Sequence, residues 1–163
     1  MVNTVIIFGN SGSGKSTLAQ HLKQQHKLAH LDLDTLAWEA TEPPTRRAQE
    51  ASIQDIHAFI KQHPRWVIEG CYAGLLSFIA PLAEQAVIMD LPVTRCQENA
   101  TNCPWEPHKY ASQAAQDENL PMLLDWIAGY EKRTDEFSQS AHEQLFAEFT
   151  GKKIRHRDNP DMD

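Results

Sequence analysis

The chain alternates between short, continuous runs of hydrophobic residues and longer stretches in which hydrophobic residues recur every three or four positions. Short apolar runs rich in β-branched residues are typical of strands buried on both faces, and the recurring pattern is typical of helices that bury one face. Their alternation predicts an α/β fold in which helices cover both faces of a parallel sheet. The expected strands cover residues 4–8, 28–32, 65–69, 86–90 and 152–156.

Helical spacing of hydrophobic residues predicts helices in the segments between these strands. The expected helices cover residues 16–25, 46–62, 120–127 and 138–150. The third of them has Asn119 as a candidate N-cap and Pro121 in its first turn, where the missing N–H is tolerated. Before it, residues 101–117 are polar and show no clear period, so we expect a mobile excursion there. Pro43 and Pro44 end the loop before the second helix.

The composition fits one compact domain, because 41% of the 163 residues are hydrophobic and 23% are charged. We therefore expect residues 1–163 to form a single domain with a lid insertion near residues 101–118. The formal net charge of −7 argues against a general polyanion binder, because such proteins neutralise phosphates with clustered Lys and Arg. Nucleic acid is thus not an expected partner, and any phosphate site must be local.

The apolar run at residues 4–8 is too short for the core of a signal peptide and lacks a basic leader. No later stretch approaches the roughly 18 apolar residues that a membrane-spanning helix needs. We therefore expect a cytoplasmic protein with no membrane partner.

Three cysteines in such a chain are expected to be reduced thiols rather than a disulfide framework. Cys96, Cys103 and His108 can be imagined as a zinc cluster. However, they supply three ligands where a closed structural site uses four, and they are not in paired CxxC spacing. Free thiols in a loop are the favoured interpretation.

The strongest chemical signal is the pattern G-x-x-x-x-G-K-S between the first buried strand and the first helix. In this context it predicts a phosphate-binding loop, because glycines let the backbone wrap a phosphate and the helix adds the positive end of its dipole. Lys15 is expected to reach the β- and γ-phosphates of ATP, Ser16 to ligate Mg²⁺, and Thr17 to contact the α-phosphate. The expected nucleotide-binding residues are Gly9, Asn10, Ser11, Gly12, Ser13, Gly14, Lys15, Ser16 and Thr17.

Two carboxylates, Asp32 and Asp34, stand at the end of the second strand, where open α/β sheets place ligands. The strand period of two would turn both to the same side. Asp32 would hold a Mg²⁺-bound water, and Asp34 would accept a proton from an acceptor hydroxyl group. The alternative is that the pair marks a strand end and a helix cap. Glu69 ends the third strand and is a candidate for the outer shell of the metal or for the acceptor.

Phosphoryl transfer also needs cations that neutralise charge on the transferring group. From residue 97 to residue 131 the chain has no Arg and a single Lys, Lys109. Arg133 follows the third predicted helix and is the best arginine candidate, with Arg95 second. For each arginine, a solvated surface position is an equal alternative.

The segment PWEPHKY at residues 104–110 is unusually rich in aromatic and polar side chains for a loop. Trp105 and Tyr110 either close over a nucleotide base or an acceptor, or pin the loop to the domain. Trp38, after the aspartate pair, either lines the acceptor pocket or fills the core. The core is the better interpretation for Trp38.

The chain resembles the P-loop kinases of the nucleoside-monophosphate-kinase and shikimate-kinase type, and more closely the FlaR-like and AAA-family ATPase proteins. The matching segments lie in about the first 95 residues: GNSGSGKST at 9–17, HLDLDTLAW at 30–38, WVIEGCY at 66–72 and VIMDLP at 87–92. The segments at 104–110 and 133–138 are similar to those of a small branch often labelled shikimate-kinase-like.

This resemblance implies a three-layer sandwich with a five-stranded parallel sheet of order 2-3-1-4-5, ATP as donor and a flexible lid. It also implies that Asp34 meets the acceptor. True shikimate kinases carry a glycine triplet after the third strand and arginines that grip the shikimate carboxylate, whereas this chain has Glu69-Gly70-Cys71 there. FlaR-like proteins usually show Asp-Gly-Asn-Tyr with an arginine soon after, which this chain lacks. The acceptor is therefore not carried over.

Together these features predict an ATP- and Mg²⁺-dependent phosphotransferase that acts on a small molecule or a nucleotide. The residues expected to act are Lys15, Asp34 and Arg133 in catalysis, and Ser16, Asp32 and Glu69 at the metal. The aspartate pair and the lid favour this class, because a plain ATPase has no acceptor to bind. The alternatives are a regulatory P-loop ATPase or switch of the FlaR-like kind, and a P-loop protein that binds nucleotide without chemistry.

Overall fold

The computed structural model of the chain describes residues 2–41 and 44–162, so Pro43 lies outside the described residues. Five parallel strands form one sheet in the order β2-β3-β1-β4-β5, which confirms the predicted fold class and strand order. The strands are β1 (Thr4–Gly9), β2 (Ala29–Asp32), β3 (Trp66–Gly70), β4 (Gln85–Met89) and β5 (Lys152–His156). The predicted ranges therefore match every strand to within one residue at each end.

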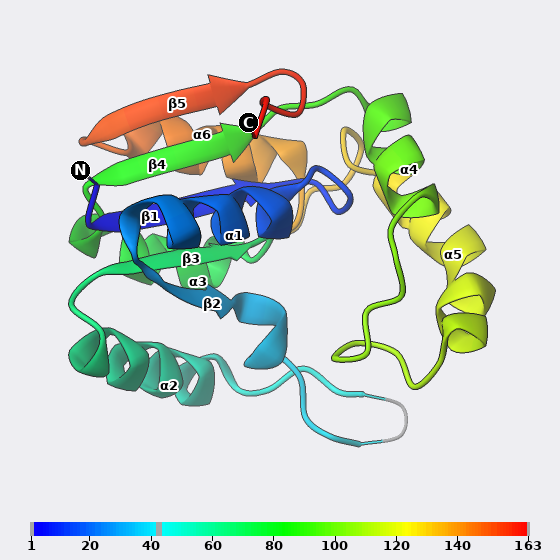
Figure 1. Cartoon of the computed structure of the whole chain (residues 1–163), viewed down its shortest axis with the longest axis horizontal. Coiled ribbons are helices and arrows are strands. Elements are labelled where there is room, and N and C mark those ends of the chain that lie inside the picture. Colours follow the sequence, from blue (N-terminus) through cyan, green and yellow to red (C-terminus); the bar gives the residue numbers. More distant parts are fainter. Residues whose placement is uncertain (1, 42–43, 163) are drawn as a thin grey trace.

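Six α-helices and two short 3-10 helices connect and flank the strands (Figure 1). The α-helices are α1 (Lys15–His26), α2 (Gln49–Gln62), α3 (Ala73–Ile79), α4 (Val93–Thr101), α5 (Gln113–Ala128) and α6 (Gln139–Glu148). The 3-10 helices are η1 (Leu33–Thr35) and η2 (Ala80–Leu82). The sequence pattern predicts no helix where α3 and α4 lie, because both are short.

Two hydrophobic cores lie on opposite faces of the sheet, and β1 supplies both of them. Val5 and Ile7 join a core with side chains of α1, α4 and α5, while Ile6 and Phe8 join a core with side chains of α2, α3 and α6. Alternate residues of a strand point to opposite faces, so one buried strand anchors two helical layers. The result is a three-layer arrangement.

The predicted excursion at residues 101–118 is shorter than expected. Helix α5 begins at Gln113, and its N-cap is Ser112, whose side chain accepts a hydrogen bond from the Ala115 N–H, so the prediction of Asn119 as N-cap is wrong. The side chain of Asn119 instead donates to the Tyr110 hydroxyl group at 2.8 Å. Pro121 lies inside the helix rather than in its first turn. The polar residues before it face solvent and hide the helical period.

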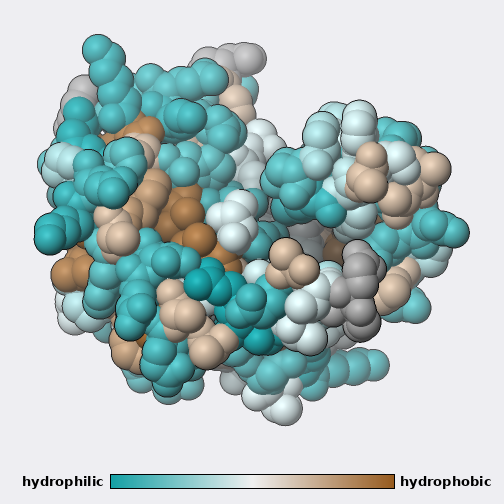
Figure 2. Space-filling model, turned by 90° about the horizontal axis from the view of Figure 1, so that it is seen from below, coloured by the Kyte–Doolittle hydropathy of each residue, from teal (hydrophilic) through white to brown (hydrophobic). Residues whose placement is uncertain are grey.

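Helices α4 and α5 lie beyond the carboxyl ends of the strands, with the connecting loop in front of the sheet edge (Figure 1). Seen from below, a deep notch separates this part of the molecule from the body that contains the sheet (Figure 2). The fold thus places a cleft at the edge where parallel α/β sheets hold their ligands. None of the helices in the described part of the chain has the length and apolarity to cross a membrane.

Candidate functional site

The loop between β1 and α1 has a backbone shape that depends on glycine. Gly12 and Gly14 have φ angles of +76° and +90°, in the left-handed region that side chains with a Cβ rarely adopt. A Cβ on Gly12 would lie 2.4 Å from the Cys96 carbonyl oxygen, and one on Gly14 would lie 2.5 Å from Nδ2 of Asn159. Gly14 is also the N-cap of α1, so the loop turns directly into the positive end of the helix.

Most of the predicted phosphate-binding residues line one cleft of about 590 Å³. They are Ser11, Gly12, Gly14, Lys15, Ser16 and Thr17. Asn10 and Ser13 instead turn into the protein, where they are 2% and 0% exposed, and Asn10 donates from Nδ2 to the Ile127 carbonyl oxygen at 3.2 Å. The Lys15 ammonium group donates to the Asn10 carbonyl oxygen at 2.7 Å. These contacts hold the loop and its lysine at the mouth of the cleft.

The carboxy-terminal tail packs against the phosphate-binding loop through two asparagines. Nδ2 of Asn159 donates to the Ser13 carbonyl oxygen at 3.0 Å. Nδ2 of Asn99, on α4, lies 2.9 Å from the Gly12 carbonyl oxygen and 2.8 Å from Oδ1 of Asn159. Both asparagines line the cleft. Sequence reasoning does not find Asn99, because it lies 87 residues from its partner in the loop.

Glu69 lies beside the start of α1, next to the predicted metal ligand. The Ser16 hydroxyl group donates to Oε2 of Glu69 at 2.6 Å. Nε2 of His30 lies 2.9 Å from the same oxygen. The Glu69 side chain is only 2% exposed, so these two contacts provide much of its stabilisation. The sequence analysis does not single out His30, although the strand period places it on the same side as Asp32.

The position of Asp34 relative to Asp32 differs from the prediction. Strand β2 ends at Asp32, and Asp34 lies in η1, so the strand period does not determine its direction. Oδ1 of Asp32 accepts a hydrogen bond from the Asp34 N–H at 2.9 Å, which is the capping contact that the alternative interpretation expects. Asp32 is also the register partner of Glu69 on β3. Asp32 can therefore cap η1 and also lie close to the carboxylates of Asp34 and Glu69.

A lysine from the loop between α4 and α5 joins the two aspartates. Nζ of Lys109 lies 3.2 Å from Oδ2 of Asp34, 3.9 Å from Oδ2 of Asp32 and 3.3 Å from Oε2 of Glu106. Its ammonium group is the positive charge of this carboxylate cluster. Sequence reasoning notes Lys109 as a cation of the excursion but does not pair it with the aspartates.

The two aspartates have different ionisation. Burial raises the pKa of Asp32 to about 6, with further contributions from the charges of Glu69 and Asp34 that outweigh the opposing effect of Lys109. Burial also acts to raise the pKa of Asp34, but Lys109 and the Tyr72 hydroxyl group outweigh it and hold this pKa below its usual value. Asp34 is therefore ionised over the physiological pH range, whereas Asp32 is the more basic carboxylate of the pair.

Tyr72 and Trp38 extend the site beyond Asp34. The Tyr72 hydroxyl group donates to Oδ1 of Asp34 and accepts a hydrogen bond from Nε1 of Trp38 at 2.9 Å. Tyr72 is 2% exposed, whereas Trp38 is 45% exposed. The prediction that Trp38 fills the core is therefore wrong, because its indole N–H is held by a hydroxyl group at the edge of the site. Tyr72 directly follows the turn after β3, which is the signal that can identify it.

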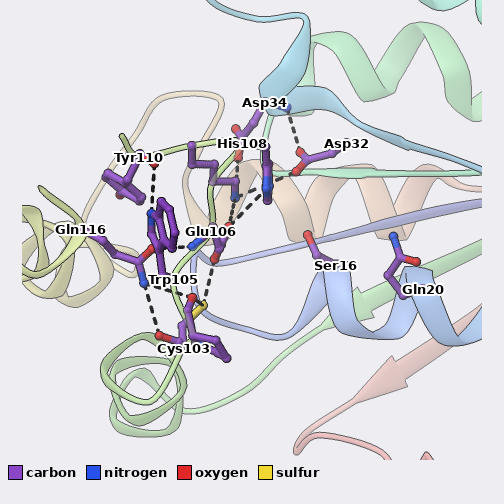
Figure 3. Close-up of polar contacts among 12 residues, drawn as sticks. Ser16, Gln20, Asp32, Asp34, Cys103, Trp105, Glu106, His108, Tyr110 and Gln116 are labelled. Atoms are coloured by element: carbon purple, nitrogen blue, oxygen red, sulfur yellow. Dashed lines mark hydrogen bonds and ion pairs between the residues drawn. The ribbon is translucent and has the colours of Figure 1, made fainter. Parts of the chain in front are cut away.

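The loop that carries Lys109 is held by its own hydrogen bonds (Figure 3). The side chain of Gln116, on α5, accepts from the Glu106 N–H at 2.8 Å and donates to the carbonyl oxygens of Cys103 and Pro104. Nε1 of Trp105 donates to the Tyr110 carbonyl oxygen at 3.0 Å. The aromatic cluster thus fixes the loop, while Trp105 itself remains 42% exposed.

Arg133 lies away from the cleft in this structure. Its guanidinium group stacks over the Trp126 ring at 3.7 Å and donates to the Trp126 carbonyl oxygen. It lines a separate groove of about 540 Å³ beside α5, and Leu123 is shared with the cleft. The second arginine candidate, Arg95, pairs with Glu98 and Asp158, both at 3.1 Å. A catalytic role for Arg133 therefore requires its guanidinium group to leave Trp126.

The side chains at the cleft fit Mg²⁺, because this ion prefers oxygen ligands and keeps several waters and phosphate oxygens around it. The cleft offers the hydroxyl group of Ser16 and the carboxylate of Glu69, and Asp32 lies beside Glu69 on the neighbouring strand. Within residues 2–41 and 44–162, no three His, Cys, Asp or Glu side chains converge as a metal cluster. Phosphate oxygens and water would therefore complete the coordination of Mg²⁺.

The cysteines do not provide a nucleophile. Cys71 and Cys103 line the cleft, but burial raises the pKa of Cys71 to about 12 and that of Cys103 to about 11. The Cys103 thiol group donates to Oε1 of Glu106. Cys96 is fully buried, and burial raises its pKa to about 11. All three cysteines are free thiols.

No protein-family profile and no curated protein sequence matches this chain. Its fold is similar to a crystal structure of shikimate kinase from Bacteroides thetaiotaomicron, with a TM-score of 0.49 and 13% sequence identity. The similarity covers 90% of this chain and 98% of that one. At this identity and score, neither a substrate nor the role of any residue is transferred from the neighbour.

Proposed function

We propose that the protein is an ATP- and Mg²⁺-dependent phosphotransferase whose acceptor is a small molecule or a nucleotide. The observation that carries the proposal is that a single cleft joins the phosphate-binding loop at Lys15 and Ser16 to an ionised carboxylate, Asp34, held by Tyr72. A protein that only binds or hydrolyses a nucleotide does not need a carboxylate beyond the phosphates. It also does not need a buried tyrosine hydroxyl group that orients such a carboxylate.

The donor side of the cleft binds the phosphates of ATP. Backbone N–H groups of the loop, the amino-terminal end of α1 and the ammonium group of Lys15 neutralise the β- and γ-phosphates. Ser16, with Glu69 and Asp32 nearby, would hold Mg²⁺, which when bound would neutralise negative charge on the phosphates.

The acceptor side binds a hydroxyl group next to Asp34. An ionised Asp34 accepts the proton as the acceptor oxygen attacks the γ-phosphate, and the Tyr72 hydroxyl group fixes the direction of the carboxylate. Asp32 acts closer to the metal, since it lies beside Glu69 on the neighbouring strand.

Residues 102–112 form the lid of the site in this proposal. The lid supplies one cation, Lys109, which now neutralises the aspartates. If the Lys109 side chain moved so that its ammonium group contacted the phosphates, Asp34 would be free to act as a base. The lysine would then neutralise negative charge on the phosphate that is transferred. Arg133 is the second cation that the proposal assigns to the closed state.

The experiment compares Asp34→Asn with Asp32→Asn, which are nearly isosteric changes. Asp34→Asn cannot take a proton, so it should bind ATP normally but transfer phosphate about 10²–10⁴-fold more slowly. Asp32→Asn should instead change the Mg²⁺ concentration needed for half-maximal turnover. Full acceptor-dependent turnover in Asp34→Asn would exclude its role as base, and turnover that never depends on an acceptor would favour a switch ATPase.

A further inference from the structure

A ring of hydrogen bonds joins the start of α1 to the ends of β2 and β3. Ser16 Oγ donates to Oε2 of Glu69 at 2.6 Å, and Nε2 of His30 lies 2.9 Å from the same oxygen. The other ring nitrogen, Nδ1 of His30, lies 2.7 Å from Nε2 of Gln20. Ser16 and Gln20 are four residues apart on α1, so they share one face of the helix. Figure 3 shows both side chains turned to the same side of α1.

The chemistry of its members fixes the direction of each hydrogen bond in the ring. The amide nitrogen of Gln20 can only donate, so Nδ1 of His30 accepts and Nε2 carries the hydrogen. Nε2 therefore donates to Glu69, whose Oε2 accepts two hydrogen bonds. Glu69 itself lines the cleft.

We propose that His30 is a positioning residue, which acts through Glu69 on the metal side of the site; this inference rests on the proposed function. Two hydrogen bonds on Oε2 restrict rotation of the Glu69 carboxylate, which lines the cleft. The hydrogen of the Ser16 hydroxyl group is committed to Glu69, which leaves the lone pairs of Oγ available to Mg²⁺. Hydrogen bonds one layer outside the metal ligands commonly orient those ligands.

A role in packing alone does not account for these contacts. His30 uses both ring nitrogens, and its side chain is 11% exposed beside a carboxylate that is 2% exposed. An apolar side chain at this position would fill the same space but donate nothing, and would leave the buried charge of Glu69 with Ser16 as its remaining partner. Substitutions at His30 can therefore separate the effect of losing the hydrogen-bond donor from the effect of changing the side-chain volume.

The test compares His30→Leu with His30→Gln, because glutamine keeps a donor near the place of Nε2 and leucine does not. The first readout is Mn²⁺ binding to the complex with ADP, followed by electron paramagnetic resonance. The second is the affinity for ADP in EDTA, measured by calorimetry. His57→Leu, which changes an exposed histidine of α2, is the matched control.

We expect His30→Leu to weaken Mn²⁺ binding by about 10–100-fold and to leave ADP affinity in EDTA unchanged. His30→Gln should stay within a few-fold of wild type. Because His30 acts through Glu69, His30→Leu should add nothing further in a Glu69→Gln background. Unchanged ADP affinity in EDTA also shows that the variants are folded.

Three results would overturn the inference: wild-type Mn²⁺ binding in His30→Leu, an equal loss of ADP affinity with and without metal, or full additivity with Glu69→Gln. In each of these cases the proposed function stands if the wild-type protein binds ADP with a divalent ion. Absence of any ADP binding by the wild-type protein would instead overturn the proposed function, and this inference with it.

Discussion

A buried histidine gives the protein a specific dependence of stability on pH. His142, on α6, is fully buried and has both ring nitrogens in contact. Nε2 lies 2.8 Å from the Cys71 carbonyl oxygen, which can only accept, so Nε2 carries the hydrogen. Nδ1 then accepts from the Tyr130 hydroxyl group at 2.7 Å. A second proton, on Nδ1, would displace the hydrogen that Tyr130 donates and would place a charge among buried residues.

The structure sets the size of this effect. Burial lowers the pKa of His142 from 6.5 to about 4, with a further contribution from the positive charges of Lys15 and Arg133. Below pH 6.5, His142 is protonated in the unfolded chain but stays neutral in the folded chain. The free energy of unfolding therefore falls as the pH decreases and levels off near pH 4. Each pH unit in this window costs about 1.4 kcal/mol, which gives a loss of about 2–3 kcal/mol at pH 4.5.

The assay is urea unfolding of wild type and His142→Gln at pH 7.0, 5.5 and 4.5. Asp32 changes stability in the opposite direction in its own window, because its folded pKa is raised to about 6. It is present in both proteins, however, so the difference between them isolates His142. We expect His142→Gln to be less stable at pH 7.0 and this deficit to shrink by about 2–3 kcal/mol at pH 4.5. A deficit that does not change with pH would refute the reasoning.

Three further predictions concern the cations that the proposed function uses. Lys15→Ala should weaken Mg²⁺·ATP binding or turnover roughly tenfold or more, because a charge-assisted contact contributes about 1.5–3 kcal/mol; equal affinity in calorimetry would contradict this. Lys109→Met should lower transfer by about 10–100-fold at saturating ATP through loss of the lid cation. Wild-type turnover in Lys109→Met, with Lys132→Met as surface control, would remove Lys109 from the mechanism. Arg133→Ala should lower turnover by up to about 10³-fold, and unchanged turnover would identify Arg133 as a residue that only stacks on Trp126.

The strands and the phosphate-binding loop could be predicted from the sequence because their signals are local. A buried strand is a continuous apolar run, and the loop from Gly9 to Ser16 needs its glycines at fixed positions. The start of α5 could not be predicted, because its first turn is polar and its cap, Ser112, looks like any loop serine. Helices α3 and α4 are too short to show a reliable period.

The contacts of the site were harder to predict, since they join residues far apart in the chain. Lys109 meets Asp34 across 75 positions of sequence, from 34 to 109, and no local pattern records that pairing. The hydrogen bond from Nε1 of Trp38 depends on Tyr72, so composition alone favours a core position for the tryptophan. Arg133 shows the same limit, because its stacking partner depends on how α5 ends.

The most direct test of the proposed activity is the fate of the γ-phosphate. ATP labelled on that group is incubated with the protein, Mg²⁺ and pools of small hydroxyl compounds and nucleotides, and the products are separated by chromatography. The account predicts label on one acceptor class, consumption of ATP that depends on that acceptor, and loss of the product in Asp34→Asn. Label found only in inorganic phosphate, at a rate that no pool changes, would contradict the account.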